Sequence, residues 1–221
     1  MSAEIGKTVA QLLLDARAIH VSRTQPYILA AGWASPVYVD CRVLIGEPEH
    51  RRAIIELAFQ HARAAFPPAS FDAIAGAETA GIPFACWLAD RMNVKLRYVR
   101  KRALGVGRHA QIEGGSVDGL RVLLVDDLTS DGSSKLAFTR GLRAANAVVE
   151  HALTIFYHNA FPGAATRLAH AGLLLHSLAT WADVLRADAA NGLATEDRTE
   201  IERFLADPIA WSTNHGGRSA A

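Results

Sequence analysis

The sequence predicts an α/β fold, with a central, mostly parallel sheet flanked by helices. Between residues 71 and 178, short apolar segments typical of strands alternate with longer segments of helical periodicity, which indicates a parallel sheet covered by helices. One segment, residues 122–125, is a continuous aliphatic run, as in a strand buried on both faces of a sheet. The 221 residues, 50% of them hydrophobic, suffice for one such domain and a sizeable core.

The first 45 residues predict a helix and a small hood in front of the sheet. Residues 8–19 predict an amphipathic helix, because one face carries Val9, Leu12, Leu13, Ala16 and Ile19. Residues 32–40 combine turn residues with the alternating pair Val37 and Val39, which predicts a short strand. We therefore expect residues 1–45 to form an N-terminal helix and hood.

Periodicity and turn signals delimit the α/β core, which we expect at residues 46–180. A long helix over residues 47–66 is terminated by Pro67 and Pro68. The further strands are predicted at residues 71–76, 94–99, 120–126, 148–157 and 173–178, and the further helices at residues 81–93, 132–146 and 162–171. Residues 181–221 predict a C-terminal helical extension, so residues 1–221 make a single domain.

Residues 100–119 join two predicted strands without any helical pattern. A connection of about twenty residues without structure of its own is often a functional loop. Residues 100–115 contain four glycines together with Arg100, Lys101, Arg102, Arg108 and His109. This content predicts a mobile, cationic loop that closes over an anionic ligand; the alternative is a solvated charged loop.

The composition narrows the class of protein. The formal net charge is +1, so no global field favours nucleic acid or membranes. No apolar run approaches the roughly 20 residues that cross a bilayer, and no signal pattern begins the chain. Cys41 and Cys86 lie far apart, and the nine histidines lack metal-ligand spacing. We expect a cytoplasmic protein that contacts neither nucleic acid nor membranes and builds no metal site from its own side chains.

The clearest chemical signal lies in residues 120–135, where an apolar strand leads into two acids and a small polar turn. Asp126 and Asp127 stand at the strand's carboxyl end, where open α/β sheets bind ligands. The following turn has little side-chain bulk, and its amides can converge on a phosphate at the start of the next helix. This order predicts carboxylates for ribose hydroxyls beside a phosphate cradle. The alternative is an ordinary strand, turn and capped helix.

Two glycine patterns resemble nucleotide motifs without matching them. Residues 76–81 have the glycine spacing of a Walker A loop, but Ile82 and Pro83 stand where lysine and Ser/Thr are needed. The turn's amides can still cradle a phosphate or pyrophosphate. Gly105 and Gly107 are followed by no helical pattern, which argues against a dinucleotide site. No GxSxG elbow supports a serine hydrolase.

With these motifs in order, residues 26–211 resemble the orotate phosphoribosyltransferase family, particularly its alphaproteobacterial form. Residues 35–42, SPVYVDCR, resemble the family's orotate-contacting hood, and residues 78–85, ETAGIPFA, the loop beneath the pyrophosphate. The mobile loop is matched by YVRK and GRHAQIEGG, and the phosphoribosyl pyrophosphate (PRPP) motif by VDDLTSDGSSK. The resemblance implies the type I phosphoribosyltransferase fold with a small hood and a mobile catalytic loop.

The resemblance also implies an activity: magnesium-dependent transfer of phosphoribosyl from PRPP to orotate, giving orotidine 5′-monophosphate and pyrophosphate in pyrimidine biosynthesis. Magnesium would arrive with PRPP, and a homodimer would share its active sites across a twofold interface. The catalytic residues implied are Asp126, Asp127 and Arg102. PRPP contacts are implied for Arg100, Lys101, Asp126, Asp127, Leu128, Thr129, Ser130, Asp131, Gly132, Ser133 and Ser134. The pyrophosphate loop would be Glu78, Thr79 and Ala80, and the orotate contacts Tyr38, Val39, Ser130 and His158.

Several positions depart from the family's common pattern. Leu104 stands where the mobile loop generally carries a lysine, so we expect Arg102 or Arg108 to compensate in part. The family's loop histidine aligns near Val106. Other departures from the commoner bacterial form are Ala30, Thr79, Ala80 and His158. Two alternatives therefore stay open: a phosphoribosyltransferase for another base, and a non-catalytic PRPP-binding regulator.

Overall fold

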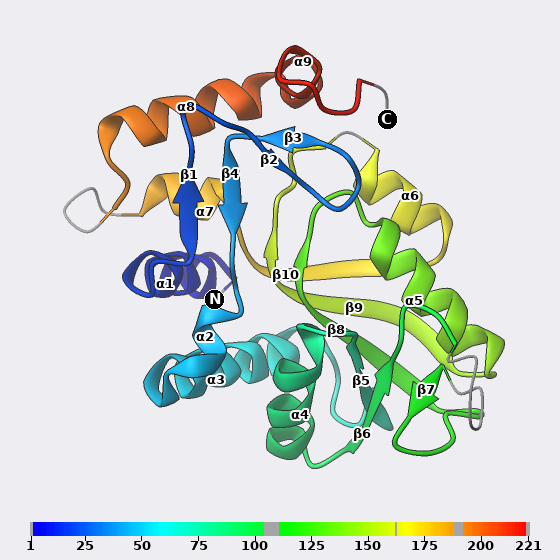
Figure 1. Cartoon of the computed structure of the whole chain (residues 1–221). Helices are drawn as coiled ribbons and strands as arrows, with labels where there is room; N and C mark the ends of the chain where they lie inside the picture. The colour runs from blue at the N-terminus through cyan, green and yellow to red at the C-terminus, as the bar shows by residue number, and fades with distance from the viewer. Residues whose placement is uncertain (1, 104–110, 162, 188–191, 220–221) are drawn as a thin grey trace.

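A six-stranded sheet with the order β10-β9-β8-β5-β6-β7 forms the centre of the protein (Figure 1). The structure is a computed structural model that describes residues 2–103, 111–161, 163–187 and 192–219. The strands are β5 (Ala73–Ala77), β6 (Lys95–Val99), β7 (Ile112–Glu113), β8 (Arg121–Thr129), β9 (Val148–Tyr157) and β10 (Leu174–Thr180). All neighbours pair in parallel except β6 and β7, which are antiparallel. The predicted mostly parallel sheet is confirmed.

Helices cover both faces of the sheet because alternate strand residues point to opposite sides. Leu123 and Val125 of β8 pack in one core with α1 (Ser2–Asp15), α3 (Pro48–Ala65) and α4 (Gly81–Met92). Val122 and Leu124 pack in a second core with α5 (Ser133–Ala144) and α6 (Ala164–His170). The continuous aliphatic run is thus a strand buried on both faces, as predicted.

The N-terminal helix differs from its prediction over residues 8–19. Helix α1 ends at Asp15, and Arg17 has a positive φ of 53° that turns the chain away. The Ala18 N–H donates to the Leu13 carbonyl at 2.8 Å, which closes the helix in the manner of a Schellman motif. Ile19 therefore belongs to a strand. The spacing of Ile19 fits the apolar face of the helix, but the helix ends at the turn of Arg17, before Ile19 is reached.

The hood consists of two small antiparallel ribbons and a short helix. Strand β1 (Ile19–Val21) pairs with β4 (Val37–Val39), and β2 (Tyr27–Ile28) pairs with β3 (Ala34–Ser35). Helix α2 (Val43–Gly46) leads from the hood into α3. Of these strands the sequence predicted only β4, where Val37 and Val39 alternate with a polar residue. The other three exist through pairing with another segment of the chain, and two of them, β2 and β3, are too short to carry an alternation of their own.

Helices at the C-terminus support the hood. The extension contains α7 (Trp181–Arg186), α8 (Thr195–Ala206) and α9 (Pro208–Asn214), and α9 packs beside β3 (Figure 1). The Ala34 N–H donates to Ser212 Oγ at 3.0 Å, and the Arg218 N–H donates to the Gly32 carbonyl at 2.8 Å. The predicted helical extension therefore holds the hood over the sheet. No described helix is both long and apolar enough to cross a membrane.

Candidate active site

The acid pair lies near the carboxyl end of the central strand β8. This strand runs to Thr129, three residues beyond its predicted end, because β9 pairs with it to Tyr157 and the His158 N–H donates to the Thr129 carbonyl at 2.9 Å. Gly132 then takes a positive φ of 82°, which favours glycine, and α5 begins at Ser133. The Asp131 carboxylate accepts from the Ser133 N–H at 3.0 Å. The acids and the helix start therefore share one short segment.

A cavity of about 490 Å³ joins this segment to the hood and to the turn after β5. Most of the predicted site residues line it: Tyr38, Val39, Glu78, Thr79, Ala80, Lys101, Asp126, Asp127, Leu128, Thr129, Ser130, Asp131, Gly132, Ser134 and His158. Ser133 lines an adjoining cavity of about 200 Å³ together with Lys101 and Ser130. The structure thus gathers three motifs that are distant in the sequence.

A glycine brings the turn after β5 close to the acid pair. A Cβ atom on Gly81, the first residue of α4, would lie 2.5 Å from the Val125 carbonyl oxygen and 2.8 Å from the Asp126 Cα. Only a residue without a side chain fits between these backbone atoms. The preceding peptide, between Glu78 and Thr79, is cis. The start of α4 and the end of β8 therefore form one wall of the cavity.

The two acids experience different surroundings. Asp126 is 7% exposed, its Oδ1 accepts from the Asp127 N–H at 2.9 Å, and its Oδ2 accepts from the Lys135 ammonium at 2.5 Å. Burial raises the pKa of Asp127 to about 7, the neighbouring charge of Asp126 contributes to this rise, and Lys135 opposes both effects. Asp127 therefore shares a proton near pH 7 and becomes fully a carboxylate at higher pH, beside one buried cation.

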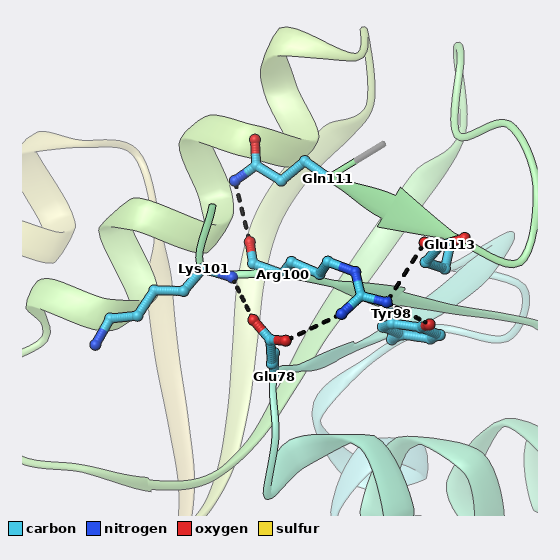
Figure 2. A network of polar contacts seen from close by, with 6 residues as sticks. All are labelled: Glu78, Tyr98, Arg100, Lys101, Gln111 and Glu113. Carbon is cyan, nitrogen blue, oxygen red and sulfur yellow. Dashed lines mark hydrogen bonds and ion pairs between the residues drawn. The ribbon is translucent and has the colours of Figure 1, made fainter. Parts of the chain in front are cut away.

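The first residues of the predicted loop are held by a polar network (Figure 2). The Arg100 guanidinium donates to Glu78 Oε1 and to the Tyr98 hydroxyl, each at 3.2 Å, and lies 3.5 Å from Glu113 Oε1. The Lys101 N–H donates to Glu78 Oε2 at 3.0 Å, whereas its side chain extends away from the network (Figure 2).

Of the three cations predicted at the start of the loop, Lys101 alone lines the 490 Å³ cavity. Arg100 is directed into the polar network, and Arg102 is exposed. Leu104, Val106, Arg108 and His109 lie outside the described residues. Strand β7, which the sequence did not predict, pairs Ile112 with Val99 and so brings the two ends of the loop together.

The hood side of the cavity carries one buried histidine and one oriented tyrosine. His158 is 2% exposed, and its Nδ1 accepts from Trp181 Nε1–H at 3.2 Å. Burial lowers the pKa of His158 to about 4, so the ring is neutral near pH 7 and its proton, by inference from this hydrogen bond, is on Nε2. Tyr38 accepts from Arg42 at 2.7 Å through its hydroxyl. The ring of His158 can therefore offer a neutral donor.

Five residues that line the cavity were missed as site residues by the sequence analysis. They are Ile28, Leu29, Ala30, Lys135 and Phe138. Lys135 carried a usable signal, because a lysine in the first turn of a helix is disfavoured by the helix dipole and needs another reason to be there. The four apolar residues carried none, since nothing in their spacing separates them from ordinary core positions.

No group of three or more histidine, cysteine, aspartate or glutamate side chains among the described residues could hold a metal ion. A magnesium ion that enters on a phosphorylated ligand would therefore take its coordination from ligand and water oxygens, as Mg²⁺ commonly does.

Comparisons with known proteins agree on one family. The model of the phosphoribosyl transferase domain matches residues 45–164. The orotate phosphoribosyltransferase of Rhizobium rhizogenes is 44% identical over 217 residues, covering 97% of this chain and 93% of that protein. The crystal structure of the Aeropyrum pernix orotate phosphoribosyltransferase has a TM-score of 0.68 at 30% identity, covering 80% of this chain and 96% of the other. Leishmania donovani UMP synthase has a TM-score of 0.76 at 25% identity, covering 91% of this chain, which spans 42% of that protein.

Proposed function

This chain belongs to the orotate phosphoribosyltransferase family, and we propose that it transfers phosphoribosyl from PRPP to orotate, forming orotidine 5′-monophosphate and pyrophosphate for pyrimidine biosynthesis. The observation that carries the proposal is the convergence of three motifs on one cavity: the acid pair with its helix start, the turn after β5, and the hood. Magnesium is part of the substrate, since it arrives on the pyrophosphate of PRPP and neutralises charge there as a Lewis acid.

The acid pair and the start of α5 suit the phosphoribosyl group. As the bond from the anomeric carbon to pyrophosphate breaks, positive charge develops on the ribose, and a fixed carboxylate nearby stabilises it. Asp127 would accept from ribose hydroxyls, while amides of the turn ending at Gly132 and Ser133 would hold the 5′-phosphate at the positive end of the helix. Held at both ends, the ribose would be fixed for attack by the base.

The turn after β5 and Lys101 suit the departing pyrophosphate. Thr79 and Ala80 line the cavity just before the start of α4, where backbone amides favour an anion. The Glu78 carboxylate would repel pyrophosphate if it were free, but it is engaged by Arg100 and by the Lys101 N–H. The Lys101 ammonium then supplies a positive charge on this side of the cavity.

The hood suits the base. Orotate would lie between the backbone of Tyr38 and Val39 and the side chains of Ser130 and His158, all of which line the cavity. Neutral His158 would donate one hydrogen bond but no charge to the orotate carboxylate. This feature favours the second candidate function, a phosphoribosyltransferase for an uncharged base.

Turnover measurements distinguish these functions. Orotate consumption with PRPP and magnesium is followed by absorbance, beside a panel of purine and pyrimidine bases. We expect turnover with orotate, and we expect Asp127→Asn to lower it by about 100-fold, the scale of lost transition-state electrostatics. If another base is turned over faster than orotate, that base replaces orotate as the proposed substrate. Binding of PRPP without turnover of any base would instead indicate the regulator.

We further propose a homodimer in which Arg102, an exposed residue at the start of the loop, acts on the partner's pyrophosphate. Arg102→Ala and Asp127→Asn variants should each be nearly inactive alone. When they are mixed, hybrid dimers would contain one site with neither change, and activity should partly return. Sedimentation measures the assembly itself. A monomeric mass, or no recovery in a mixture proved to exchange subunits, would exclude the shared site.

A further inference from the structure

A buried lysine lies directly beneath the acid pair. Lys135 stands in the first turn of α5 and is 2% exposed. Its ammonium group donates to Asp126 Oδ2 at 2.5 Å and to the Leu128 carbonyl at 2.7 Å. The ammonium therefore ties the helix that follows the turn to the strand that carries the acids.

The helix does not account for a lysine at this position. The first turn lies at the positive end of the helix dipole, where a cation is unfavourable. Burial of an ammonium group is also strongly unfavourable unless an opposite charge and further acceptors surround it. Asp126 and the Leu128 carbonyl supply both. The buried ammonium is thus tolerated because of these two acceptors, and in return it holds both of them in place.

Lys135 gives the two acids of the pair different hydrogen-bond surroundings. Both oxygens of Asp126 are engaged with protein donors, one with the Asp127 N–H and the other with the lysine. Asp127 is less buried than Asp126 and lines the cavity. A bound sugar can therefore reach the oxygens of Asp127 with less rearrangement than those of Asp126.

We propose that Lys135 is a positioning residue of the reaction, which fixes Asp126 so that Asp127 is presented, as a carboxylate, to the ribose. The assignment rests on the proposed function for its substrate. Two adjacent buried carboxylates repel each other, and one of them takes up a proton unless a cation compensates. Lys135 is that cation, and it acts through Asp126.

Other charged or titratable groups face the acid pair and set the background for any pH effect. Asp40 and Arg42 lie beside the buried thiol of Cys41, whose pKa is raised by burial and by both acids of the pair. The remaining groups, which line the cavity, are Tyr38, Glu78, Lys101, Asp131 and His158. None of these is altered in the variants below, so their contributions stay constant across the comparison.

The test compares Lys135→Met with wild type over a range of pH. Methionine keeps much of the side-chain volume and removes the charge. The acid limb of the kcat/KM profile should move to higher pH by roughly one unit, as expected when a compensating charge is lost beside a carboxylate. In Lys135→Met/Asp126→Asn the second carboxylate is neutral, so the acid limb should return toward lower pH. Lys95→Met, which removes an exposed lysine, is the matched control and should leave the profile in place.

Infrared absorption of protonated carboxyl groups gives a readout that does not need turnover. The band should persist to higher pH in Lys135→Met than in wild type and disappear when Asp127→Asn is added. A folded Lys135→Met protein with unchanged infrared and kinetic profiles overturns the proposal. If Lys135→Met alone does not fold, the comparison moves to the Asp126→Asn background. There a further loss above about twofold from Lys135→Met would show that the lysine does not act through Asp126. If orotate is not turned over, the proposed function fails, but the infrared measurement still tests the role of Lys135.

Discussion

Replacing Gly81 by alanine tests whether the first residue of α4 must touch the acid pair. The added Cβ would lie 2.5 Å from the Val125 carbonyl oxygen, whereas ordinary contact begins near 3.4 Å. The start of α4 or the end of β8 must therefore move by about 0.9 Å. Both contacts are backbone atoms of a buried strand, so no flexible side chain can give way.

The displacement has two measurable consequences. Overpacking of this kind costs about 1–3 kcal/mol, and at roughly 2–4 °C per kcal/mol for a protein of this size the melting temperature should fall by roughly 2–12 °C. A misplacement near 1 Å can lower turnover by about 100-fold. Gly81→Ala should therefore lose far more activity than its loss of stability explains at a temperature where it is fully folded.

Gly46→Ala is the matched control, because a Cβ there meets nothing within 4 Å. Gly46 ends α2 and is exposed, so alanine should keep or slightly raise the melting temperature through its helix propensity. Calorimetry and orotate turnover are measured on both variants. If Gly81→Ala matches Gly46→Ala in melting temperature and kcat, the close contact does not hold the acid pair, and the reasoning is refuted.

Three further predictions concern charge. Lys101→Met should lower kcat by about tenfold or more, with Lys95→Met unchanged; equal rates would remove Lys101 from the pyrophosphate site. Glu78→Gln should raise the KM for PRPP, because it loosens Arg100 and the Lys101 N–H; an unchanged KM would contradict this. Burial lowers the pKa of His158 and of His176 to about 4, so the unfolded chain binds more protons and stability should fall from about pH 6.5 toward pH 4. His176→Asn should flatten this slope in urea unfolding.

The sheet could be predicted from the sequence because its strands and helices carry their own periodicity. Residues 122–125 and the helix ended by Pro67 needed no knowledge of their neighbours. The short strands β1, β2, β3 and β7 could not be found this way, since each exists through pairing with a distant segment. For the same reason β8 extends to Thr129: its last residues are strand only because β9 lies beside them.

The acid pair and the turn after it were likewise visible in the sequence, because a strand, two acids and small polar residues form one contiguous signal. The sequence did not show, however, which cation pairs with which anion. Arg100 and Lys101 are adjacent and both cationic, yet Arg100 is engaged by Glu78 and Glu113 while Lys101 lines the cavity. Both residues follow the end of β6 at Val99, and which side chain meets the carboxylates depends on how β6 and β7 pair.

The electrostatic character of the cavity depends more on which acids are already engaged by the protein than on how many acids line it. The described cavity wall includes four acidic residues, Glu78, Asp126, Asp127 and Asp131, although the proposed ligand is a polyanion. Three of them are already engaged: Glu78 with Arg100, Asp126 with Lys135, and Asp131 with the amide and hydroxyl of Ser133. In the proposed reaction, Asp127 is then left to face the ribose, where positive charge develops, and Lys101 to face the pyrophosphate. The internal contacts of the other three acids thus reconcile this acidic cavity with the polyanion that we propose as its ligand.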